Sequence, residues 1–165
     1  MSFYLKFYWK IIIENNTTQE WNLETDGTGS QWHVTLKRSH DPAFSLRFGR
    51  PDADNFDVGQ RTLGNAISPP ITLPFSGEKT LSMWIYFDAE EFGLADLFDI
   101  SIRTGPSVQT VWSKPDLPTA AYRLWYPITI DLAAYSGATI EVIMRFDSVD
   151  EIFNLGEGVY LDEIR

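Results

Sequence analysis

The sequence predicts an all-β fold, an antiparallel β-sandwich of the jelly roll type with about ten short strands. Short runs rich in β-branched and aromatic residues recur between turn residues, and no segment keeps the apolar period of an amphipathic helix. Nine prolines and eleven glycines are spread along the chain and oppose long helices. Because its 165 residues contain no repeat, low-complexity tract or linker, we expect one domain over residues 1–165.

The first expected strand covers residues 3–13, inside the most apolar stretch of the chain. Its apolar side chains alternate with tyrosine and lysine, which is the period of a half-buried strand and differs from that of an export signal. Further strands are expected at Trp32–Lys37, Phe44–Phe48, Ala66–Leu73, Thr80–Phe87, Leu97–Arg103, Gln109–Trp112, Arg123–Asp131, Thr139–Phe146 and Gly158–Ile164.

Charge and composition exclude several classes of protein. The chain has 13 Lys plus Arg against 23 Asp plus Glu, a formal net charge of −10. Such an excess of acids argues against nucleic acid and anionic membranes as partners, and no stretch is long and apolar enough for membrane insertion. The absence of cysteine excludes disulfides, thiolate catalysis and cysteine-ligated metals.

No catalytic motif is visible, and we expect a protein that is not an enzyme. His33 and His40 lack a second histidine at metal-ligand spacing, and His33 is interpreted as a structural or surface residue. A β-sandwich glycosidase would need two facing carboxylates, but Asp96 and Asp99 are three residues apart and would point to opposite sides of a strand. Glycosidase activity is therefore only a remote alternative.

Five weak motifs occur in a recognisable order, although none is specific alone. They are Glu14…Trp21…Gly29-x-x-Trp32, the segments at Asn65–Leu73, Thr80–Phe87 and Ile130–Gly137, and the closing Gly158–Ile164. This order resembles a MAM-type, concanavalin A-like jelly roll and is similar to the accessory β-domains of immune inhibitor A type secreted bacterial proteases. The resemblance covers roughly residues 14 to 165. It implies an extracellular or cell-surface setting and a non-catalytic role, although Glu163 replaces the usual second Asp.

Jelly roll modules of this type often carry a structural calcium ion, and the resemblance implies one between the first and last strands. Alternation places Asp162 on the same face as Tyr160 and Ile164, so its carboxylate needs a cation, an ion pair or hydrogen-bond donors. Glu14 and Asp162 are the best expected ligands, with Asp41 a plausible third. The alternative is that Asp162 pairs with an arginine or accepts backbone amides.

Two further acidic positions have simpler interpretations. The run Asp52, Asp54, Asn55 and Asp57 is similar to a calcium loop but lacks its glycine and closing Glu, so a solvated loop is favoured. Asp131 is expected to cap the turn that follows it.

A ligand-binding face is predicted from strand alternation. In Thr80–Phe87 the aliphatic residues form a core face, so Trp84 and Tyr86 point the other way. The polar sides of two later strands carry Asp99, Arg103 and Arg145. If these strands are neighbours, aromatic rings and charged groups combine into a surface suited to carbohydrate.

The alternatives at this face are that a loop or the first strand covers the aromatics, or that they pack against arginine stems. The facing of Trp112 and Trp125 is left open. The overall prediction is a non-catalytic binding module, with a protein–protein interaction or structural spacer domain as the alternative. The aromatic strand at residues 3–13 would then contact a neighbouring domain.

Overall fold

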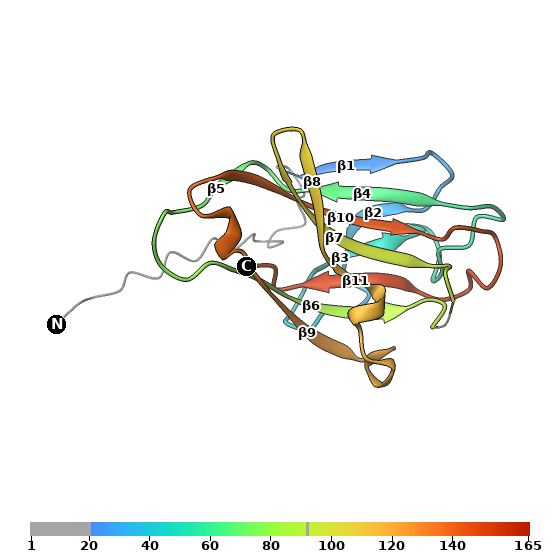
Figure 1. Cartoon of the computed structure of the whole chain (residues 1–165). Helices are drawn as coiled ribbons and strands as arrows, with labels where there is room; N and C mark the ends of the chain where they lie inside the picture. Colours follow the sequence, from blue (N-terminus) through green and yellow to red (C-terminus); the bar gives the residue numbers. More distant parts are fainter. Residues whose placement is uncertain (1–20, 92) are drawn as a thin grey trace.

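The computed structural model describes residues 21–91 and 93–165 and confirms the antiparallel jelly roll (Figure 1). Two sheets pack face to face. Sheet I has the strand order β1-β4-β10-β7-β8, with the short β5 beside β10, and sheet II has the order β2-β3-β11-β6-β9. The strands of sheet I are β1 (Asn22–Thr25), β4 (Leu63–Ile67), β5 (Ile71–Thr72), β7 (Leu97–Thr104), β8 (Ser107–Ser113) and β10 (Thr139–Asp147). Those of sheet II are β2 (Gln31–Thr35), β3 (Ser45–Gly49), β6 (Thr80–Asp88), β9 (Trp125–Asp131) and β11 (Gly158–Asp162).

Three single-turn 3₁₀ helices complete the described elements: η1 (Lys114–Asp116), η2 (Thr119–Ala121) and η3 (Ala133–Tyr135). The amide of Ala133 donates to the carboxylate of Asp131 at 2.8 Å, which confirms the predicted cap. No helix within the described ranges is long and apolar enough to cross a membrane.

Every strand expected between residues 32 and 164 is present, with one division. The expected strand Ala66–Leu73 is two strands, β4 and β5, because Pro69 and Pro70 between them have no amide hydrogen for the ladder. Strand β1 was not expected, since its sequence Asn-Leu-Glu-Thr carries a single apolar side chain. The expected strand at residues 3–13 lies outside the described residues.

The core lies between the sheets and follows the alternation of the strands. Leu81, Met83, Ile85 and Phe87 of β6 are all buried in it, as predicted. The Trp32 indole N–H, also buried there, donates to the Gly64 carbonyl at 3.1 Å. Phe48 from sheet II stacks on Phe146 from sheet I, with ring centroids 4.6 Å apart. Each fully buried apolar side chain of this size contributes about 1.5–3 kcal/mol to stability.

The strand register brings two loops to the same end of the sandwich, away from the C-terminus (Figure 1). Leu97 pairs with Asp147, and Gly158 pairs with Asp88, so the β6–β7 and β10–β11 loops both leave from this end. Gly158 has φ +93°, and a Cβ there would overlap the carbonyl oxygen of Phe48. Only glycine fits at this start of β11.

Candidate functional site

The outer face of sheet II carries a row of aromatic rings. Across the sheet, Tyr160 of β11 pairs with Tyr86 of β6, which pairs with Trp125 of β9, while Trp84 lies beside them on β6. Ring centroids are 5.7 Å apart for Tyr86 and Trp125, and 5.8 Å apart for Tyr86 and Tyr160. We call Trp84, Tyr86, Trp125 and Tyr160 the aromatic face. The prediction that Trp84 and Tyr86 point away from the core is confirmed, and Trp125 joins them.

The β2–β3 loop, residues 36–44, crosses this face and places two planar polar groups on it. The guanidinium carbon of Arg38 lies 3.9 Å from the Tyr86 ring centroid. The His40 imidazole stacks on Trp84 with centroids 3.8 Å apart and planes 12° from parallel. The rings of Tyr86 and Tyr160 are buried, whereas Trp84 and Trp125 are half-buried. The β2–β3 loop therefore covers part of this face, as the alternative interpretation predicted, and the two tryptophans are the rings that keep partial exposure.

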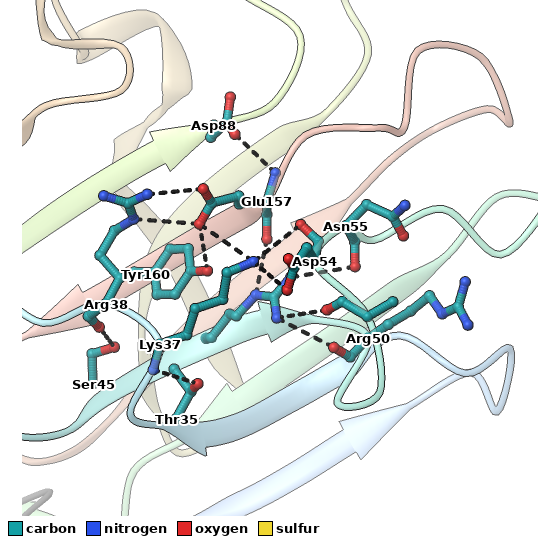
Figure 2. A network of polar contacts seen from close by, with 12 residues as sticks. Thr35, Lys37, Arg38, Ser45, Arg50, Asp54, Asn55, Asp88, Glu157 and Tyr160 are labelled. Atoms are coloured by element: carbon teal, nitrogen blue, oxygen red, sulfur yellow. Dashed lines mark hydrogen bonds and ion pairs between the residues drawn. The ribbon is translucent and has the colours of Figure 1, made fainter.

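A network of charged groups borders the aromatic face (Figure 2). Arg38 donates to both carboxylate oxygens of Glu157, at 2.8 and 3.3 Å, and the Tyr160 hydroxyl donates to Glu157 at 2.8 Å. Burial, together with this hydrogen bond, raises the pKa of Tyr160. Burial would raise the pKa of Glu157, but the bonds from Arg38 and Tyr160 outweigh it and lower that pKa. Glu157 therefore stays ionised and Tyr160 protonated at neutral pH.

Arg47 holds the loops beneath this network in place. Its guanidinium is buried and donates to the Glu157 carbonyl at 2.9 Å. Three more carbonyls accept from it, all in the β3–β4 loop: those of Arg50, Ala53 and Asn55. A buried arginine that satisfies four carbonyls fixes the loop backbone, which makes its role structural.

The acidic run in the same loop forms ion pairs with neighbouring cations. Asp54 lies 2.7 Å from the Lys37 ammonium, and Asp52 lies 3.1 Å from Arg50. The carboxylates of both are largely exposed. This arrangement fits the interpretation of a solvated loop.

The prediction of one combined ligand face is wrong, because its members lie on two different sheets. Trp84 and Tyr86 belong to sheet II, whereas Asp99 and Arg103 of β7 and Arg145 of β10 belong to sheet I. The core separates the two outer faces. The physical reason is that the chain crosses from one sheet to the other between β6 and β7, so strands that are consecutive in sequence are not neighbours.

On sheet I Arg145 of β10 pairs directly with Asp99 of β7, whereas Arg103 lies four residues further along β7, opposite Glu141. Arg103 pairs with Glu141 at 2.7 Å, and Arg145 pairs with Asp147 at 2.6 Å. Burial raises the pKa of Asp99. Within the described residues no strand residue on this outer face is aromatic, since Trp112 of β8 packs against Phe98 of the core.

Backbone amides surround the carboxylate of Asp162. His40 and Asp41 donate to its Oδ2 at 2.6 and 3.0 Å, and Glu163 donates to Oδ1 at 2.7 Å. The alternative of amide hydrogen bonding therefore describes this residue. Asp162 shares its face with Tyr160 as predicted, but Ile164 lies in the core because Glu163 adopts φ +49° and reverses the alternation.

The predicted calcium ligands are not brought together by the described residues. Glu14 lies outside them, and Asp41 approaches Asp162 through its backbone amide. Among residues 21–91 and 93–165 no three His, Asp or Glu side chains are grouped as a metal site. Calcium at Asp162 therefore stays a prediction.

Comparison with known proteins supports the fold. No family model and no curated protein matches the chain, so the resemblance to MAM-type and immune inhibitor A domains gains no support. A family 61 carbohydrate-binding module solved with β-1,4-galactotriose has a TM-score of 0.61 and 12% identity, over 92% of this chain and 90% of that one. The K3 adhesin domain of Lys-gingipain from Porphyromonas gingivalis has a TM-score of 0.61 and 18% identity, over 94% and 97%. A family 22 xylan-binding domain has a TM-score of 0.52 and 13% identity, over 91% of this chain and 87% of that one. The TM-scores establish a shared β-sandwich fold.

Proposed function

We propose that the protein is a non-catalytic carbohydrate-binding module that acts outside the cell or at its surface, and that glycan binds on the aromatic face of sheet II. The observation that carries this proposal is the pair of half-buried tryptophans, Trp84 and Trp125, beside hydrogen-bonding side chains. The C–H faces of a pyranose pack on such rings, and its hydroxyls bond to nearby polar groups. Arg38 and His40 supply donors at the same place.

Charge at the face favours neutral sugars over acidic ones. Each cationic or basic group there already has a carboxylate partner, because Arg38 pairs with Glu157 and His40 with Glu163. A uronic acid would have to compete with these carboxylates and would meet the net charge of −10. Neutral β-linked polymers are therefore the first class to test, and the similar modules named for galactotriose and xylan suggest which ones.

Calorimetric titration with β-1,4-galactotriose and with xylan oligosaccharides tests the proposal. Trp125→Ala should weaken binding by about tenfold or more, since it removes a stacking platform. Trp84→Ala should also weaken it, since it removes the ring on which His40 is stacked. The matched control is Arg145→Ala on the outer face of sheet I, which should bind as the unmodified protein does. Loss of binding in the control with unchanged binding in both tryptophan variants would move the site to the other face. Absence of binding to every neutral glycan tested would refute the proposal.

A protein-interaction domain is the second candidate function. Its support is the likeness to the gingipain adhesin domain and a group of exposed apolar side chains at one end of the sandwich. This group precedes Glu157, which borders the aromatic face, so a protein partner and a glycan would bind on adjacent parts of the surface.

A further inference from the structure

The β10–β11 loop, residues 148–157, presents large apolar side chains to solvent. Ile152 is 53% exposed, and Phe153 and Leu155 are each 75% exposed. We call Ile152, Phe153 and Leu155 the apolar tip. The β6–β7 loop, at the same end of the sandwich, adds Leu94 at 86% exposure. Single exposed apolar residues are common, but a run of three on one loop marks an interaction site.

Hydrogen bonds hold the tip in place from below. Asp150 accepts from the Ile152 amide at 2.8 Å and, through its carbonyl, from the side chain of Asn154 at 3.0 Å. Asn154 is itself buried. Ser148 exchanges two hydrogen bonds with the backbone of Thr62 in the β3–β4 loop, at 2.9 and 3.0 Å. The apolar side chains are therefore presented by a braced loop.

The same loop contains backbone strain. Val149 has φ +69° and Phe153 has φ +60°, the left-handed region that bulky side chains rarely adopt. Glycine or asparagine at these positions would relieve the strain. Strained residues cluster at functional sites, and here one of them is an exposed phenylalanine.

The charge around the tip indicates the kind of partner. The sequence stretches 88–96 and 147–157 contain eight Asp or Glu residues and no Lys, Arg or His. Four of these acids, Asp88, Glu91, Asp147 and Glu157, pair with arginines from elsewhere, and Asp96 is buried. Glu151, within the tip loop, is exposed. An apolar surface with an acidic surround complements an apolar surface with a basic rim.

We propose that the apolar tip is a docking element for a protein partner whose binding surface is an apolar patch bordered by lysine and arginine. An anionic membrane would be repelled by the same carboxylates. The tip loop ends at Glu157, which borders the aromatic face, so the two proposed sites are adjacent and the experiments below separate them.

A fluorescent amphipathic helical peptide built from leucine and lysine is the probe, because it carries the two properties that the proposal requires. Fluorescence anisotropy should show saturable binding of the peptide to the unmodified protein. The double variant that combines Ile152→Ser and Leu155→Ser should bind the peptide about tenfold or more weakly. The matched control is Leu36→Ser, which removes an exposed leucine from a different loop and should leave binding unchanged. A peptide with glutamate in place of lysine should not bind.

Phe153→Asn separates binding from folding. Asparagine tolerates the left-handed backbone, so this variant should melt at the same or a higher temperature while losing affinity for the leucine–lysine peptide. Its titration with β-1,4-galactotriose should match that of the unmodified protein, which distinguishes failure of this proposal from failure of the glycan site. Peptide binding that is absent, or equal in all tip variants, would overturn the proposal. Tip-dependent binding to vesicles of phosphatidylcholine and phosphatidylglycerol in place of the peptide would also overturn it.

Discussion

Asp96 at the start of β7 makes the stability of this domain depend on pH. Its carboxyl group is fully buried, and Oδ2 accepts the Glu90 amide at 2.7 Å. Oδ1 has no hydrogen-bond partner within the described part of the chain. Burial raises the pKa of Asp96 to about 7, only partly opposed by that amide and by the positive charge of Lys114. We therefore predict that Asp96→Asn stabilises the protein above neutral pH.

The size of the effect follows from this pKa. The folded state binds the proton of Asp96 more tightly than the unfolded chain does. The contribution of this proton to the stability of the fold is therefore complete below pH 3.8 and is lost as pH rises through about 7. The difference between these two pKa values corresponds to about 4 kcal/mol, an upper bound because solvent and loop rearrangement screen the charge. We expect a net cost of about 1–3 kcal/mol for the ionised group. Asparagine keeps the acceptor for Glu90 and cannot ionise.

Thermal melting in a series of buffers from pH 4 to pH 8 measures the difference. The two proteins should melt within about 1 °C of each other at the acidic end, and Asp96→Asn should melt about 3–9 °C higher at the alkaline end. The matched control is Asp116→Asn, which removes an exposed carboxylate near Lys114. The difference in melting temperature between this variant and the unmodified protein should be the same at pH 5 and at pH 8. A gap that does not grow with pH would refute the reasoning. A variant that is less stable at pH 8 would show that ionised Asp96 stabilises the fold through Lys114.

Three further predictions concern stability. Arg47→Met should lower the free energy of unfolding in urea by about 3 kcal/mol, since four carbonyls lose their donor; an unchanged value would contradict the structural role of Arg47. Gly158→Ala should cost about 2–4 kcal/mol, whereas Gly59→Ala, at a similar φ with open space around it, should cost about 1 kcal/mol, and equal costs would contradict the overlap with Phe48. If calcium binds at Asp162, a chelator should lower the melting temperature of the unmodified protein and leave that of Asp162→Asn unchanged. Identical melting curves of the unmodified protein with and without chelator would contradict the calcium prediction.

Strand alternation alone was enough to predict which side chains of a strand face the core. It placed Leu81 and Met83 inward and Trp84 and Tyr86 outward, because successive side chains of a strand point to opposite faces of its sheet. The same pattern explains why most strand positions could be predicted. Strand β1 could not, because four mostly polar residues at a sheet edge carry no periodic signal.

The pairing of strands could not be predicted in the same way. Asp99, Arg103 and Arg145 were grouped with Trp84 on the assumption that their strands are neighbours, and the chain instead crosses between sheets after β6. Alternation specifies a face but does not specify which sheet. Contacts made by loops were equally hidden, since the placement of Arg38 and His40 on the aromatic face depends on tertiary packing.

The resonances of the tryptophan indole N–H groups test the proposed glycan site most directly. In a titration of ¹⁵N-labelled protein with β-1,4-galactotriose or a xylan oligosaccharide, the resonances of Trp84 and Trp125 should shift. Those of the core residue Trp32 and of Trp112 in sheet I should not, because neither lies on the aromatic face. Assignment by single tryptophan-to-phenylalanine variants makes each signal identifiable. Shifts confined to Trp112, or to backbone amides of β7 and β10, would contradict a glycan site on sheet II.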